Sequence, residues 1–450
     1  MTIEQLKKIK EKLEKYNLVS VIDNISDWFG KLNDKQIKNI LSLKLYYGQL
    51  EKYSKLLINL AFLDSDNYLS DIKLLLIYED KINDTNEIYK LLTDPNFINS
   101  KYHNEDLKSI LSTKDEEARK YLIRLAISTI SINSKYHRED MTKLSSKIFE
   151  HYNHNLVKKR YSLYENFVNY VIAFSKTNVD DKFYSYDGYK ILESKTEEKS
   201  NIIQSVSLNK QSLESKYHVN DIEIIIKAKF DEIARYLGML ACDENSLKQD
   251  DHEENMVFVS SAKNTKQAYI LYSLIKEKSE LSNINYNFIM NTVLKCNDSF
   301  ALQRVCDLIV DYGLKKITPY ISLIINSSID KFDMLCDLSI HSDVFSPDMI
   351  VKFNNIKYFP ASRLYYNVLI KYMHDSNKLN DIYEKVRDLP DFGIHNVLSK
   401  YLNIDEQSKK EVKKQEDKLM NKEKLDLMYQ SPLKYVDDNK CNELSGKVLV

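Results

Sequence analysis

The sequence predicts an all-α protein built from tandem two-helix units. Glycine and proline are scarce, with 7 Gly and 6 Pro in 450 residues, so few tight turns are available. Apolar residues recur at helical spacing, and one tetrapeptide, Ser-Lys-Tyr-His, occurs three times. These observations disfavour many-stranded sandwiches and barrels, and also nucleotide-binding folds that depend on glycine-rich loops.

The repeated tetrapeptide gives the register of the units. Its copies start at Ser100, Ser134 and Ser215, and an aspartate follows each histidine by three residues: Asp106, Asp140 and Asp221. The first two copies start about 34 residues apart, a separation typical of helical repeats. Sliding Ser134 onto Ser215 reveals a degenerate fourth copy that starts at Asp181, and the same separation leads from Asp181 to Ser215. Weaker matches extend this period in both directions.

Each unit is predicted to contain two helices. In the copy at Ser215, apolar residues fall at helical spacing from Ile222 to Ile226 and again from Ile233 to Leu240. A break near Lys229 separates the two runs, and the acidic pair Asp231-Glu232 suits the start of the second helix. Alanines at the equivalent positions 118 and 234 would allow the two helices of a unit to approach closely.

This period and helix layout resemble the α-solenoid proteins, the class that includes tetratricopeptide and HEAT-like arrays. The resemblance implies a right-handed α-solenoid of about nine to ten two-helix repeats with a period of about 34 residues. It covers most of the chain but concerns only period and layout. The tetratricopeptide pattern of Trp, Leu-Gly, Tyr, Ala and Pro is absent, so no ligand-binding residues are carried over from that class.

The repeats suggest three regions. Residues 1–30 are expected to form an N-terminal capping helix, residues 31–403 the tandem-repeat array, and residues 404–450 a charged C-terminal helix and tail. One unit, 134–180, is longer, because Asp181 lies further from Ser134 than the common period. Its extra residues are assigned to 150–175, which is rich in tyrosine and phenylalanine, including Tyr161, Tyr164, Phe167, Tyr170 and Phe174. Either they project as a binding insertion, or they extend the second helix and pack on the neighbouring unit, which is the favoured interpretation.

Two interpretations of the motif Ser-Lys-Tyr-His-x-x-Asp remain open. In the favoured one it is a structural joint: the serine caps a helix, the tyrosine packs between units, and the histidine holds a loop carbonyl or the aspartate. In the other, the histidines form a ladder for an anionic ligand, a metal or a partner peptide. Equivalent positions on adjacent repeats lie about 8–10 Å apart, too far for shared metal ligation. If the units bind a partner, the candidate residues are Tyr102, His103, Tyr136, His137, Tyr217, His218, Tyr164 and Tyr170.

Catalytic and cofactor motifs are absent from the sequence. It contains no GxSxG, P-loop, GxGxxG, HExxH or CxxC, and its five cysteines are scattered. His151 and His154, next to Glu150, resemble half of a metal site, but no matching ligand pair follows, and solvent-facing histidines are expected there. We therefore expect no enzymatic activity, no metal and no cofactor.

Charge and hydropathy bear on partners and location. The 65 basic and 66 acidic residues give a net charge of −1, which argues against a nucleic-acid partner. No apolar run approaches the roughly 20 residues of a membrane span, and the N-terminus lacks a signal-peptide core, so a cytoplasmic protein without a membrane partner is expected. The expected function is a non-enzymatic scaffold or adaptor whose groove binds a protein or peptide. The alternative is a regulatory protein whose helical repeats sense a ligand or peptide.

Overall fold

The computed structural model describes residues 49, 52–57, 59–82, 85–174, 181–278 and 286–402. Within these residues the secondary structure consists of helices and turns, without a strand, so the all-α prediction is confirmed. The predicted capping helix of residues 1–30 and the charged segment 404–450 lie outside the described residues. No helix in the described ranges has both the length and the apolar character that crossing a membrane requires.

The chain divides into two compact units, residues 1–279 and 280–450. Among the described residues, the first unit contains α5 (Ser54–Leu57), α6 (Leu60–Asp64), α7 (Tyr68–Ile77), η1 (Glu79–Lys81), α8 (Thr85–Thr93), α9 (Pro95–Ile98), α10 (His103–Ser112), α11 (Glu116–Ile127), α12 (Thr129–Asn133), α13 (His137–Asn153), η2 (Val157–Lys159), α14 (Tyr161–Phe174), η3 (Asp181–Phe183), α15 (Tyr184–Glu193), α16 (Glu197–Ser207), α17 (Lys210–Glu214), α18 (His218–Lys227), α19 (Asp231–Ala241), α20 (Glu244–Leu247), α21 (His252–Ser260) and α22 (Thr265–Lys276).

The second unit contains α23 (Tyr286–Lys295), α24 (Ser299–Tyr312), α25 (Leu314–Ile317), η5 (Thr318–Tyr320), α26 (Ile321–Ile325), α27 (Ile329–Ile340), α28 (Pro347–Asn355), α29 (Phe359–Lys371), α30 (Ser376–Val386) and α31 (Asp391–Leu398). Gly313 ends α24 with a positive φ of 84°, a conformation that glycine adopts without steric strain.

A three-helix order recurs in the first unit, where the sequence predicts two helices. A long pair, such as α18 and α19, follows a short helix of four or five residues, such as α17. The short helices begin where a polar side chain accepts a backbone N–H: Asn59, Asp94, Ser128, Asn209 and Asp243. We call the first long helix of each group the A helix and the second the B helix.

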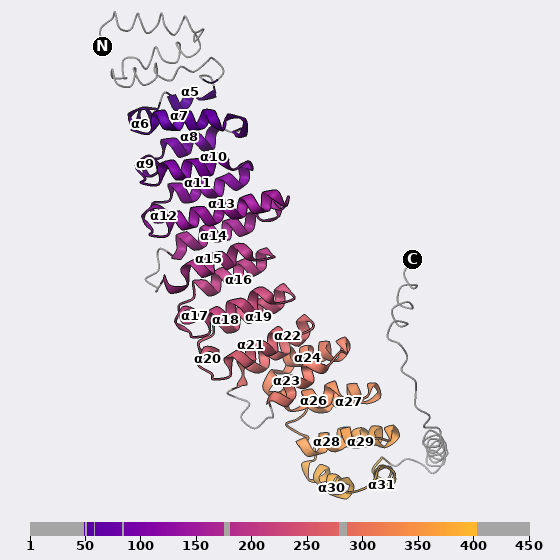
Figure 1. Cartoon of the computed structure of the whole chain (residues 1–450). Coiled ribbons are helices and arrows are strands. Elements are labelled where there is room, and N and C mark those ends of the chain that lie inside the picture. Colours follow the sequence, from indigo (N-terminus) through magenta and orange to yellow (C-terminus); the bar gives the residue numbers. More distant parts are fainter. Residues whose placement is uncertain are drawn as a thin grey trace, which may run out of the picture. The chain divides into compact units, whose positions relative to one another are not determined.

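The A and B helices pack on their own partner and on the next group. Helix α18 contacts α19 of the same group and α21 of the next, and α19 contacts both α16 and α22 (Figure 1). The apolar residues predicted for this group, including Ile222, Ile225, Ile233, Leu237 and Leu240, are buried. Ala118 and Ala234 are fully buried near the starts of their B helices, where a small side chain permits close packing.

The longer group differs from the expectation. Its A helix, α13, has 17 residues where α10, α15 and α18 each have 10. The predicted extension of the second helix is therefore only part of the difference, because two extra turns belong to the A helix. These turns end at His154, and Asn155 follows with a positive φ of 55°, which asparagine tolerates better than most residues.

Candidate functional site

The motif Ser-Lys-Tyr-His-x-x-Asp forms a joint between consecutive groups of the first unit. The histidine Nε2 lies within hydrogen-bond distance of the aspartate of the preceding group, not of its own. These pairs are His103–Asp71 at 2.8 Å, His137–Asp106 at 2.8 Å, His218–Asp187 at 3.1 Å and His252–Asp221 at 3.1 Å. All eight side chains are buried, so each pair is shielded from water.

A serine that the sequence interpretation missed fixes the other side of the imidazole. The residue six positions before the histidine is Ser131, Ser212 or Ser246 in three groups, and its hydroxyl lies 2.9 Å from Nδ1 in each. A hydroxyl can donate to Nδ1, which leaves a proton on Nε2 for the aspartate. The signal was present in the sequence as a serine at constant spacing before the histidine.

His103 has a different environment because Phe97 occupies the equivalent position. Its Nδ1 lies 3.1 Å from the carbonyl oxygen of Phe97, which can only accept a hydrogen bond. Nδ1 must therefore carry a proton, while Nε2 faces the carboxylate of Asp71. Although burial opposes the charge of His103, the hydrogen bond and charge of Asp71 and the Phe97 carbonyl together raise its pKa.

The remaining motif residues complete the joint. Each serine accepts the backbone N–H of the tyrosine two residues later, in the turn before the A helix and not at its N-cap as expected: Ser100, Ser134 and Ser215. Each lysine places its ammonium 4.8 to 4.9 Å from the centre of the adjacent tyrosine ring. Each tyrosine ring lies against the ring at the histidine position of the next group. The distances between ring centres are 4.7 Å for Tyr102 and His137, 4.3 Å for Tyr136 and Tyr184, and 4.8 Å for Tyr217 and His252.

The degenerate copy keeps the joint with different chemistry. Tyr184 occupies the histidine position, and its hydroxyl donates to the Asp140 carboxylate at 2.6 Å. Burial raises the pKa of Asp140 to about 7, and the Tyr184 hydrogen bond opposes this only in part. Tyr170 donates to the backbone carbonyl of Tyr184 at 3.2 Å and is fully buried, so this insertion aromatic packs within the fold.

The eight residues considered for partner binding thus contact other groups of the same chain. His103, His137, His218, Tyr164, Tyr170 and Tyr217 are buried, and Tyr102 and Tyr136 are half-buried. His151 is also buried, contrary to expectation, and its Nδ1 lies 2.7 Å from the Tyr164 hydroxyl; burial lowers its pKa. In the described part of the chain, no three His, Cys, Asp or Glu side chains are grouped as metal ligands.

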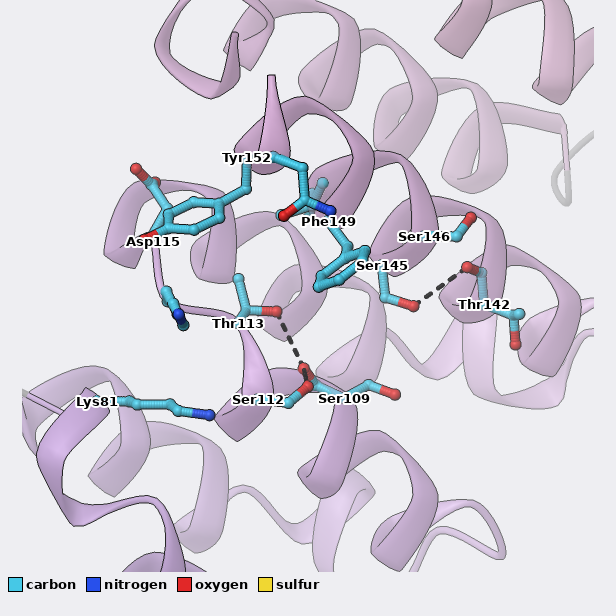
Figure 2. Close-up of a pocket in the computed structure, with 13 residues that line it drawn as sticks. Lys81, Ser109, Ser112, Thr113, Asp115, Thr142, Ser145, Ser146, Phe149 and Tyr152 are labelled. Carbon is cyan, nitrogen blue, oxygen red and sulfur yellow. Dashed lines mark hydrogen bonds between the residues drawn. The ribbon is translucent and has the colours of Figure 1, made fainter. Parts of the chain in front are cut away.

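An accessible cavity lies elsewhere in the described part of the chain, between two A helices. It has a volume of about 480 Å³ and is bordered by the C-terminal half of α10, the turn into α11, α13 from Thr142 onward and η1 (Figure 2). Its lining residues are Lys81, Ser109, Ser112, Thr113, Lys114, Asp115, Thr142, Ser145, Ser146, Ile148, Phe149, Tyr152 and Asn153. We call this cavity the α10–α13 groove.

Two aromatic side chains form one wall of the α10–α13 groove. Phe149 is 67% exposed and Tyr152 is 42% exposed, and both belong to the extra turns of α13 (Figure 2). They face the groove because α13 continues for two turns beyond the length of α10. The range 150–175 predicted for the extra residues includes Tyr152 but leaves out Phe149.

The groove also contains two ammonium groups. Arg119 donates hydrogen bonds to the carbonyls of Lys81 and Thr113, at 2.7 and 2.6 Å, and so holds η1 against the end of α10. Lys81 lies 4.8 Å from the ring centre of Tyr78, and Lys114 lies 5.4 Å from that of Tyr152. Neither lysine forms an ion pair with any residue in the described ranges.

The single carboxylate of the groove is already engaged. Asp115 accepts the backbone N–H of Ala118 at 2.8 Å and so caps α11. It also accepts the hydroxyl of Tyr161, at 2.9 and 3.0 Å to its two oxygens. These bonds direct its oxygens toward α11 and α14, so the two lysines remain without a carboxylate partner in the described structure.

The floor of the groove is lined by hydroxyl groups that mostly present lone pairs. Ser112, Thr113, Thr142, Ser145 and Ser146 each donate their hydroxyl proton to a backbone carbonyl three or four residues earlier. Their oxygens retain acceptor capacity. The groove therefore combines neutral hydrogen-bond acceptors, an aromatic wall and two positive charges.

In comparisons with known proteins, no family model matches the sequence, and neither a curated protein nor a solved structure matches it.

Proposed function

We propose that the chain is a right-handed α-solenoid of about nine to ten two-helix repeats that serves as a non-enzymatic scaffold or adaptor. The recurring His–Asp pairs support the repeat assignment, because one contact joins residues 31 or 32 positions apart four times. Stacked repeats of this kind expose long grooves between successive helices. In this proposal, the buried motif residues hold the scaffold together, and the partner contacts other side chains.

The observation that carries the proposal is the exposed aromatic wall of the α10–α13 groove. Phe149 is two-thirds exposed, so most of its apolar surface stays in contact with water and would gain free energy if a partner covered it. Aromatic side chains are enriched at protein interfaces. A cavity of about 480 Å³ next to it offers room for side chains of a bound segment. The groove also contains no nucleophile paired with a base, so we propose binding without turnover.

The test is selection of a displayed random-peptide library on the full chain. We expect selected peptides to compete with one another and to be recovered intact after prolonged incubation. Replacing Phe149 and Tyr152 with alanine should weaken their binding by about tenfold or more, because aromatic residues dominate interface energetics. The matched control is Phe300→Ala, since Phe300 is 66% exposed and belongs to α24 of the second unit.

Two results would count against the scaffold. In the first, the selected peptides bind the Phe149 and Tyr152 variant as well as the original chain but no longer bind Phe300→Ala. This result would show that the binding site is not the α10–α13 groove. The other is cleavage or modification of bound peptides by the purified chain, which would contradict a non-enzymatic role. Thermal stabilisation by small metabolites together with failure to select any peptide would instead favour the ligand-sensing alternative.

A further inference from the structure

We propose that the segment bound in the α10–α13 groove is an acidic peptide, in which a glutamate or aspartate lies next to an apolar or aromatic residue. This inference rests on the proposed function and specifies the chemistry of the partner. Three properties of the groove support it: the charge of its two lysines, the acceptor character of its floor and the apolar wall.

Lys81 and Lys114 give the groove its positive charge. Both ammonium groups line the groove, and in the described structure neither is neutralised by a carboxylate. Asp115, the acidic residue beside them, is held by Ala118 and Tyr161. A carboxylate from a partner could therefore pair with either lysine without displacing an existing ion pair, and charge-assisted hydrogen bonds are about twice as strong as neutral ones.

The hydroxyl groups on the floor of the groove favour a peptide over a simple anion. The hydroxyls of Thr142, Ser145 and Ser146 donate their protons to carbonyls of their own helix, so towards a ligand their oxygens can only accept. An extended peptide supplies backbone N–H donors for these acceptors, whereas an inorganic phosphate presents mainly further acceptors. The floor therefore favours a ligand that carries donors as well as a negative charge.

The small number of cations in the groove argues against nucleic acid as the favoured occupant. A nucleic-acid strand presents a phosphate at every nucleotide and is usually matched by a row of cations, while the groove offers two and the whole chain has a net charge of −1. Phe149 and Tyr152 instead offer contact area to an apolar side chain next to the carboxylate.

The test uses three immobilised heptapeptide libraries and the labelled full chain. The central residue is fixed as glutamate, glutamine or lysine, and the flanking positions are an equal mixture of leucine, phenylalanine, serine and glycine. We expect the glutamate library to retain about tenfold more protein than the glutamine library at low salt, and the lysine library to retain least. Raising the salt concentration should reduce the difference between the glutamate and glutamine libraries.

Variants of the lysines identify the groove as the source of this preference. The double variant Lys81→Gln with Lys114→Gln should bind the glutamate and glutamine libraries equally. The matched control is Lys108→Gln, because Lys108 is an exposed lysine of α10 that does not line the groove. It should keep the full preference, and circular dichroism of all variants should match that of the original chain.

The outcomes distinguish this inference from the proposed function. If the glutamate and glutamine libraries retain the chain equally, and neither retains Phe149→Ala, the partner is not an acidic peptide, while the proposed scaffold function still holds. No retention of any library would contradict both. Binding of oligouridylate in preference to the glutamate library, abolished by the double lysine variant, would assign the groove to nucleic acid and overturn the inference.

Discussion

Buried histidines and carboxylates hold the first unit together at the scale of single residues. His137 and Asp106 are both buried, and each is the other's hydrogen-bond partner. Burial raises the pKa of Asp71, Asp106, Asp187 and Asp221 despite the opposing effect of the histidines. Each pair therefore stabilises the fold only while both members are present. The hydrogen bond to the partner offsets the unfavourable free energy of removing each side chain from water.

Removal of one partner tests this dependence. His137→Leu leaves the Asp106 carboxylate and the Ser131 hydroxyl without their partner, and should lower the free energy of unfolding by about 3–5 kcal/mol. Urea unfolding followed by circular dichroism measures the change. The double variant with Asp106→Leu should lose less than the sum of the single changes, because the isolated carboxylate is gone.

The neighbouring residue Arg138 provides the control for this pair. Its ion pair with Glu105 spans 3.3 Å, and both side chains are more than half exposed. Arg138→Gln should change stability by no more than about 1 kcal/mol, since exposed pairs contribute little. Simple additivity of the His137 and Asp106 substitutions would show that the two side chains do not act as a pair.

Asp140 makes a pH-dependent contribution. Its pKa is raised from 3.8 to about 7, so the native state binds this proton over a pH range in which the unfolded chain has released it. The free energy of unfolding therefore falls as the pH rises from about 4 to 7. Asp140→Asn keeps an oxygen to accept the Tyr184 hydroxyl but does not titrate. Relative to the original chain, it should gain on the order of 4 kcal/mol between pH 4 and pH 8.

Unfolding in urea at several pH values measures this gain. Asp66→Asn, at an exposed aspartate between α6 and α7, serves as the comparison for the loss of one carboxylate. A difference between the Asp140 variant and the original chain that is constant from pH 4 to pH 8 would contradict a raised pKa. The amide does not titrate, so any stability change that the substitution itself causes is the same at every pH. The test therefore compares only how the free energy of unfolding varies with pH.

Close contact between B helices is decided at the scale of elements. A Cβ added at Gly238 of α19 would lie 2.5 Å from Cγ2 of Ile202 in α16, and these two helices pack directly together. Gly393, near the start of α31, has no neighbour closer than 3.4 Å to the same added atom. The two glycines therefore differ in how much room their surroundings leave for a side chain.

Alanine substitutions should separate the two positions. Gly238→Ala should destabilise the protein by about 1–3 kcal/mol, because Ile202 and the helices must shift. Gly393→Ala should be neutral or stabilising by up to about 1 kcal/mol, because alanine is the better helix former. Thermal melts of both variants provide the comparison, and a stabilised Gly238→Ala would show that α16 and α19 adjust without strain.

At the scale of the whole molecule, the two compact units differ in how they are built. The first unit carries the His–Asp joints, whereas the second, from residue 280 onward, lacks the motif. The second unit is packed mainly through apolar side chains, including the buried Cys336, Phe353 and Tyr365. Units with separate cores are expected to unfold with some independence.

Calorimetry of the full chain tests that independence. We expect two resolvable transitions, and His137→Leu should lower the midpoint of only one. The substitution Tyr365→Ala, which opens a cavity in α29, should lower the other. A single transition that shifts as a whole in both variants would show that the two units unfold together.

The sequence predicted that the motif forms a joint between units, but not which aspartate each histidine contacts. The repeated Ser-Lys-Tyr-His-x-x-Asp pattern identified the residues, and the burial of Ile222 and Leu237 followed from helical spacing. That His103 pairs with Asp71 rather than Asp106 could not be read from a motif in which the nearer aspartate lies three residues away. The stacking of one group on the next decides it, because an A helix places its histidine beside the preceding A helix.

The sequence by itself determined the helical class and identified the histidines, tyrosines and aspartates of the motif, since periodicity and turn composition are local properties of the chain. Only the tertiary structure decided where the α10–α13 groove lies. Phe149 and Tyr152 line it because α13 extends beyond α10, and Lys81 reaches it because Arg119 holds η1 at the same place. Such a site is formed by distances between separate helices, which spacing along the chain does not encode.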